Sequence, residues 1–149
     1  MDDQYNLHRF IEAQEPVYPA VIEELQRGRK SSHWMWFIFP QIIGLGESAM
    51  ARQYAIRSAQ EARAYLDHPV LGERLLTCTG LVIKVTGRTA MKIFGYPDEL
   101  KFRSSMTLFD AVDDNIPVFA QALIKYFDGE PDQLTLDILG QQHDTNRIE

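Results

Sequence analysis

The residue types best suited to chemistry gather between Lys30 and Gln41, where the chain reads KSSHWMWFIFPQ. This stretch holds both tryptophans of the protein, Trp34 and Trp36. Indole rings can stack on a flat ligand, and indole N–H, imidazole and amide groups need hydrogen-bond partners when they are buried. We therefore expect the segment either to line a ligand pocket or to anchor the core.

In the ligand interpretation, Trp34, Trp36 and Phe37 stack on a base-like or nicotinamide-like ring. His33 transfers a proton, while Lys30 and Gln41 bind polar parts of the ligand. In the alternative interpretation the run is buried core with polar residues at its ends. Short apolar runs bounded by polar residues are more often core than pocket.

A second group of polar side chains follows Asp98, in the sequence DELKFRSSMT. Cations and hydroxyls this close together can bind a phosphate or a carboxylate; the candidates are Lys101, Arg103, Ser104 and Ser105. Lys101 would supply positive charge, and Asp98 is a second candidate for proton transfer. Alternatively, Asp98 with Lys101 and Glu99 with Arg103 are ordinary surface pairs of a helix. Consecutive serines are indifferent helix formers, which weighs against a purely structural role.

The sequence contains no recognised catalytic motif. It lacks a phosphate loop, a dinucleotide-binding fingerprint, a zinc-binding HExxH helix and a nucleophile elbow. The four histidines are dispersed and Cys78 is the only cysteine, so we expect neither a metal site nor a resident cofactor. Cys78 lies in an apolar stripe and is interpreted as a small buried hydrophobe.

Composition fits one globular domain of 149 residues, with a core over about 5–139 and a polar tail over 140–149. A formal net charge of −6 disfavours nucleic-acid binding, which needs a basic surface. The single cysteine suits a reducing compartment. With no signal sequence and no apolar stretch of membrane-spanning length, we expect a cytoplasmic protein that does not enter membranes.

Apolar periodicity predicts a mainly α, single compact helical domain, possibly with one or two short strands. Stripes over 5–14, 17–25 and 118–127 are typical of amphipathic helices. Ser48 and Ser58 are predicted helix N-caps, and Gly28 and Gly95 predicted helix ends. The segment 81–85 fits either a helix or a short strand, and the tail from Gly140 is expected to fray.

Several motifs together resemble the bacterial family known as domain of unknown function 1810. The matching segments are 28–41, the GLG motif at 44–46, 48–56, HPVLG at 68–72 and KFRSSMTLF at 101–109. The resemblance covers about 7–139 and implies a mainly helical fold without an assigned activity. Family members are sometimes labelled calpastatin, but calpastatins resemble disordered repeats, whereas this chain is repeat-free and compact in composition.

Two segments, 68–79 and 91–95, are also similar in rhythm to the NADAR superfamily, whose members act on N-glycosidic bonds. In that pattern an acid falls where Met91 stands and a tryptophan where Phe94 stands. If the likeness extends to chemistry, Asp98 would have to supply the missing acid from another position.

These observations leave two functional hypotheses. In the first, the 33–41 and 101–105 segments wall a pocket for a nucleotide-like or phosphorylated small molecule. In the second, the chain is a non-catalytic interaction module or a homodimer that uses the aromatic segment as its interface.

Overall fold

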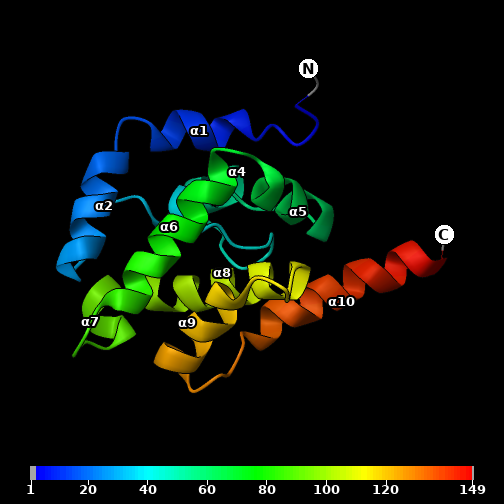
Figure 1. Ribbon diagram of the computed structural model, residues 1–149. Helices are drawn as coiled ribbons and strands as arrows, with labels where there is room; N and C mark the ends of the chain where they lie inside the picture. The colour runs from blue at the N-terminus through cyan, green and yellow to red at the C-terminus, as the bar shows by residue number, and fades with distance from the viewer. Residues whose placement is uncertain (1–2, 149) are drawn as a thin grey trace.

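The computed structural model describes residues 3–148, with side chains up to residue 143. Ten helices connected by short loops form this part of the chain (Figure 1). Their bounds are α1 His8–Gln14, α2 Tyr18–Arg27, α3 Met35–Ile38, α4 Ala49–Gln53, α5 Ala59–Asp67, α6 Leu71–Lys84, α7 Ala90–Phe94, α8 Asp98–Val112, α9 Pro117–Phe127 and α10 Gln133–Ile148. The predicted mainly α fold is confirmed.

Helix ends follow the local signals of the sequence. The hydroxyl oxygen of Ser48 accepts a hydrogen bond from the Ala51 amide, and that of Ser58 accepts one from the Glu61 amide. Gly28 ends α2 with φ 76°, a left-handed conformation in which glycine carries no steric cost. These predicted boundaries are therefore correct.

The structure also describes two further segments considered from the sequence, 81–85 and the tail from Gly140. The segment 81–85 is not a strand, because α6 continues to Lys84, and the described residues form no β-strand. The closest feature is an isolated parallel bridge between Ile42 and Ile56. The polar tail beyond Gly140 belongs to α10, which runs past the other helices in Figure 1.

Helix α8 lies at the centre of the core, in contact with α5, α7, α9 and α10 (Figure 1). Its side chains Phe102, Met106 and Phe109 are fully buried. The rings of Phe94 and Phe39 pack on Phe102, with ring centroids 4.7 and 4.9 Å away. An aromatic cluster therefore joins α7 and the end of α3 to α8, which fixes the segment before Gln41 against the central helix.

Most of the aromatic segment belongs to this core. Its buried side chains are Trp34, Met35, Phe37, Ile38 and Phe39. The core interpretation is confirmed for these residues, whereas Trp36 is half-buried. No helix in the described range has the length and apolarity needed to cross a membrane.

Candidate functional site

Trp34 has a structural role that the sequence did not reveal. Its indole N–H donates to a carboxylate oxygen of the buried Glu24 at 2.9 Å. The same carboxylate accepts from the Ser31 and Ser32 amides and from the Ser32 hydroxyl at 2.6–3.0 Å. Burial alone would raise the pKa of Glu24, but these hydrogen bonds outweigh burial and lower it to about 2. Glu24 thus fixes the loop that precedes the aromatic segment.

The two segments singled out in the sequence meet at Asp98. One of its carboxylate oxygens lies 2.9 Å from Lys30 Nζ, and the other lies 3.5 Å from Lys101 Nζ. Lys101 Nζ also lies 5.5 Å from the ring centroid of Trp36, within cation–π range. Lys30, Asp98 and Lys101 therefore form one ion-pair cluster beside Trp36.

The rest of the second segment points elsewhere. Arg103 donates to the Glu130 carbonyl and stacks over Phe127, beside the α9–α10 loop. The Ser104 hydroxyl is buried and donates to Asp132, whose carboxylate also accepts from the amide of Thr135 in the first turn of α10. Ser105 is fully buried in α8, and its hydroxyl has no described hydrogen-bond partner. These three residues do not join Lys101 in a pocket, because helical geometry turns them to other faces of α8.

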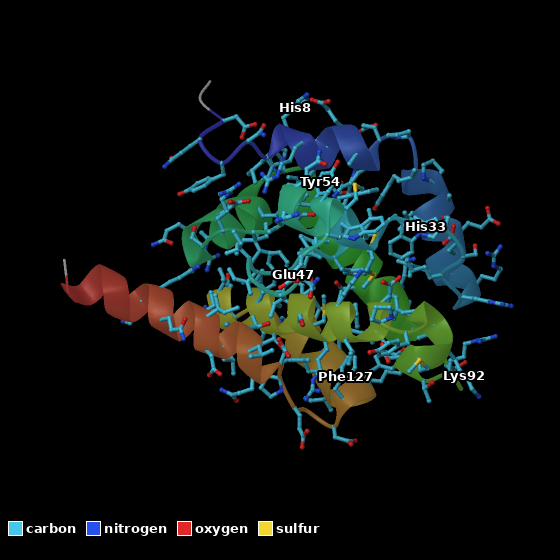
Figure 2. All side chains as sticks on the ribbon, turned by 180° about the vertical axis from the view of Figure 1, so that it is seen from behind. His8, His33, Glu47, Tyr54, Lys92 and Phe127 are labelled. Atoms are coloured by element: carbon cyan, nitrogen blue, oxygen red, sulfur yellow. The ribbon has the colours of Figure 1, made fainter. Side chains whose placement is uncertain are left out.

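His33 lies apart from any candidate pocket. Its side chain is exposed and makes no hydrogen bond or ion pair with another described residue. Figure 2 shows it near the edge of the molecule, well separated from Tyr54 and Glu47. The structure therefore does not gather the three residues proposed for proton transfer and charge, because His33 stands outside the Asp98–Lys101 cluster.

A cavity of about 490 Å³ lies beside the 36–41 end of the aromatic segment. We refer to it as the Trp36 cavity. Its walls are the end of the aromatic segment, the glycine-containing loop that follows, and α4 with its exit. The lining residues are Trp36, Gln41, Ile42, Ile43, Gly44, Gly46, Glu47, Ala51, Arg52, Tyr54 and Ala55. Other hollows on the described surface lie along α5 and the N-terminal segment, and no tryptophan lines them.

Trp36 and Gln41 are the two predicted site residues that line this cavity. Lys101 contacts Trp36 without lining the cavity, so it supports the indole from outside. The remaining lining residues were not predicted. The only sequence signal for them was the pair Gly44 and Gly46, which indicated a loop rather than a site.

Two backbone hydrogen bonds join the walls of the cavity. The Ile56 amide donates to the Gln41 carbonyl and the Ile43 amide to the Ile56 carbonyl, both at 2.8 Å. The loop between them needs its glycines. Gly44 has φ 103°, and a Cβ on Gly46 would stand 2.6 Å from Ala51 Cβ. Larger residues at these positions would displace α4 from the cavity.

Arg9 supports the opposite wall. Its Nε donates to the Gln53 carbonyl at 2.9 Å, and one terminal nitrogen donates to the Ala55 carbonyl and to Glu61. The other terminal nitrogen donates to two carbonyls of the N-terminal segment. All five N–H groups of the guanidinium are therefore used. Arg9 holds the backbone on both sides of Tyr54 against α1 and α5.

Three polar side chains of the cavity have no described partner. Among the residues that the structure describes, the side chains of Gln41, Glu47 and Arg52 have no hydrogen-bond or ion-pair partner, and Glu47 and Arg52 are exposed. Tyr54 packs edge-on against Phe37 and in a tilted arrangement against Phe10, with ring centroids 5.3 and 5.8 Å away. Figure 2 shows Tyr54 and Glu47 near the middle of the molecule. The cavity thus combines a firm aromatic wall with unpaired polar groups.

Metal and thiol chemistry receive no support from the geometry. Within residues 3–143, no three His, Cys, Asp or Glu side chains lie close enough together to hold a metal ion. Cys78 is buried in α6. Burial raises the pKa of its thiol to about 12, so the reactive thiolate is scarce near neutral pH.

Comparison with known proteins places the chain in a family. The family model described as "Protein of unknown function (DUF1810)" matches residues 4–139. The chain belongs to the DUF1810 family. It is also similar to a solved structure, that of the conserved hypothetical protein Rv1873 from Mycobacterium tuberculosis. Sequence identity is 52%, the TM-score is 0.92, and the match covers 93% of this chain and 99% of the other. No protein with a curated description matches the chain.

Proposed function

We propose that the Trp36 cavity binds a nucleotide-like small molecule, meaning a flat ring that carries polar substituents. The observation behind this proposal is the combination of the Trp36 and Tyr54 walls with the unpaired Gln41, Glu47 and Arg52 side chains. A volume of about 490 Å³ falls within the roughly 300–1,000 Å³ of typical small-molecule sites.

The supports behind the cavity favour a preformed site. Trp36 is backed by Lys101, and the wall that carries Tyr54 is tied down by Arg9. A binding wall that is already ordered loses little conformational entropy when the ligand arrives. Contacts that hold the cavity walls from behind are expected of a binding site.

We assign no reaction to the cavity. The NADAR likeness requires an acid at the position of Met91, which is exposed on α7 and does not line the cavity. Asp98, the proposed substitute, has each carboxylate oxygen next to a lysine. The proposal is therefore one of binding.

The interaction-module hypothesis has less support. Five apolar side chains of the 34–39 segment are buried in the chain's own core and offer no surface to a second copy. A homodimer would have to use another face of the molecule.

The test uses the unequal positions of the two tryptophans. In a Trp34→Phe variant, Trp36 becomes the only indole, so a ring that stacks on it should change the fluorescence. Nucleotides, ADP-ribose, NAD, flavin precursors and phosphorylated sugars are titrated into this variant, and melting temperatures are recorded in parallel. A ligand at 100 times its dissociation constant should add about 2.7 kcal/mol to the stability. A Trp36→Phe variant is the control; if no compound changes either signal, the proposal is wrong.

A further inference from the structure

We infer that the ligand is a ribonucleoside 5′-monophosphate, with its phosphate on Arg52 and the glycine-containing loop and its ribose hydroxyls on Glu47. This inference rests on the proposed function and names the ligand class for the same cavity. Three features of the lining carry it: the loop amides, the Arg52 guanidinium and the Glu47 carboxylate.

The loop amides form the first feature. The backbone N–H groups of residues 44–47 donate no hydrogen bond to any described residue. Gly44, Gly46 and Glu47 in this run line the cavity. Successive backbone amides in a turn that contains glycine bind anions in many phosphate sites, because their partial positive charges can converge on one group.

Arg52 is the second feature. It lies in the last turn of α4 and lines the same cavity as the loop amides. Its guanidinium has no described partner, and its planar fork of donors matches two oxygens of a phosphate. Loop amides and a guanidinium on one cavity make a phosphate a better fit than a neutral group.

Glu47 is the third feature. Its carboxylate would repel a ligand that carried only negative charge. It is the only carboxylate among the lining residues. A carboxylate accepts hydrogen bonds, and sugar hydroxyls donate them; dinucleotide-binding folds use an acidic side chain on ribose in this way. A ribose between the ring on Trp36 and the phosphate on Arg52 would place hydroxyl donors near Glu47.

The size of the cavity favours a ligand with one base and one phosphate. Its volume of about 490 Å³ lies in the lower half of the range for small-molecule sites, roughly 300–1,000 Å³. A single tryptophan lines it, together with a single unpaired guanidinium. A mononucleotide therefore fits this lining better than a dinucleotide.

The experiment compares matched ligands on the Trp34→Phe protein by fluorescence, with calorimetry as a second readout. The ligands are the four common ribonucleoside 5′-monophosphates, their nucleosides, their 2′-deoxy forms and inorganic phosphate. We expect at least one monophosphate to bind about tenfold or more tightly than its nucleoside, because a phosphate gains charge-assisted hydrogen bonds. We also expect it to bind more tightly than its deoxy form.

Two variants separate the assigned roles. Arg52→Gln should weaken the preference for the monophosphate, because only the loop amides remain to bind the phosphate, while leaving nucleoside affinity unchanged. Glu47→Gln should reduce the preference for ribose over deoxyribose. The matched controls are Arg29→Gln and Glu73→Gln, which alter exposed residues that do not line the cavity. Each variant is first shown to keep the parent melting temperature.

The outcomes separate a failure of the ligand class from a failure of the proposed function. If nucleosides and monophosphates bind equally, or if Arg52→Gln weakens both alike, the phosphate assignment is overturned and the proposed function stands. If ribose and deoxyribose forms bind equally, the role given to Glu47 is overturned. If nothing in the wider screen binds, the proposed function itself fails.

Discussion

At the scale of single residues, Glu24 is the side chain whose loss should be felt most directly. Its carboxylate accepts four hydrogen bonds, including that of the Trp34 indole. Glutamine offers one acceptor oxygen, and its NH2 group would face the N–H and O–H groups that now donate to the carboxylate. Glu24→Gln should therefore lower the free energy of unfolding by about 2–4 kcal/mol. Urea denaturation measures this, with Glu23→Gln as control, because Glu23 pairs only with Arg27 at the surface.

The stability loss expected for Glu24→Gln depends on pH. The pKa of Glu24 is about 2 in the folded protein, below its ordinary value of 4.5. The ionised Glu24 carboxylate therefore contributes fully to the free energy of unfolding above about pH 4.5. This contribution declines as the pH falls toward 2, by at most about 1.4 kcal/mol per pH unit. The stability difference between wild type and Glu24→Gln should shrink across this range. A difference that stays constant from pH 7 to 3 would contradict the role given to the carboxylate.

Residue types alone could not separate the two tryptophans. Trp34 and Trp36 are two positions apart with similar neighbours, yet one is fully buried and the other lines the cavity. The partner that decides this, Glu24, lies on a preceding helix. Lys30, Asp98 and Lys101 belong to the two polar segments that the sequence singled out, and the structure brings these three residues together. The orientations of Arg103, Ser104 and Ser105 depended on which faces of α8 are covered by α9 and α10.

At the scale of elements, α6 contains a matched pair of glycines. A Cβ on Gly72 would lie 2.1 Å from the Leu66 carbonyl oxygen, whereas a Cβ on Gly80 meets nothing within 4 Å. Gly72→Ala should therefore destabilise the protein by about 1–3 kcal/mol or more, because the backbone of α5 has to move. Gly80→Ala should stabilise it by about 0.5–1 kcal/mol through helix propensity. Thermal denaturation of the two variants compares them within one helix, and equal effects would refute the close approach of α5 and α6.

Arg9 connects three elements, α1, the segment after α4, and α5. Lysine keeps the positive charge but has three donors on one nitrogen, so it cannot reach all five acceptors. Arg9→Lys should lower the stability by about 1–3 kcal/mol. Because Arg9 holds the wall that carries Tyr54, any ligand of the cavity should also bind more weakly. Arg29→Lys is the control, and unchanged stability in both variants would show that the Arg9 bonds do not hold the wall.

Elements with clear end signals were predictable, and those without were not. Ser48, Ser58 and Gly28 mark helix ends through hydrogen-bonding and dihedral preferences that act within a few residues. The 81–85 segment has apolar residues that suit either a helix or a strand, and contacts of α6 with α2 and α9 decide for the helix. The loop over residues 43–47 and the segment after α4 have no periodic pattern. Their positions depend on the two backbone hydrogen bonds of Ile56, with Gln41 and Ile43, and on Arg9.

At the scale of the whole molecule, the pair of Lys30 and Asp98 joins segments 68 positions apart in the chain. The Lys30 side chain is 8% exposed, whereas that of Lys101 is 25% exposed and lies farther from Asp98. Removing one partner of a buried ion pair leaves an uncompensated charge, which costs more than losing a surface pair. Lys30→Met should therefore destabilise the protein more than Lys101→Met. A double-mutant cycle with Asp98→Asn measures both couplings, and equal coupling energies would contradict this ranking.

The single cysteine has a practical consequence for kinetic work on this fold. Cys78 is fully buried in α6 beneath α2, so a thiol-modifying reagent reaches it only when the helices separate. The labelling rate in native buffer then reports how often the molecule opens, without an engineered probe. Comparing that rate with and without a bound ligand would show whether occupancy of the Trp36 cavity makes opening of the whole molecule rarer or stabilises only the cavity's own walls.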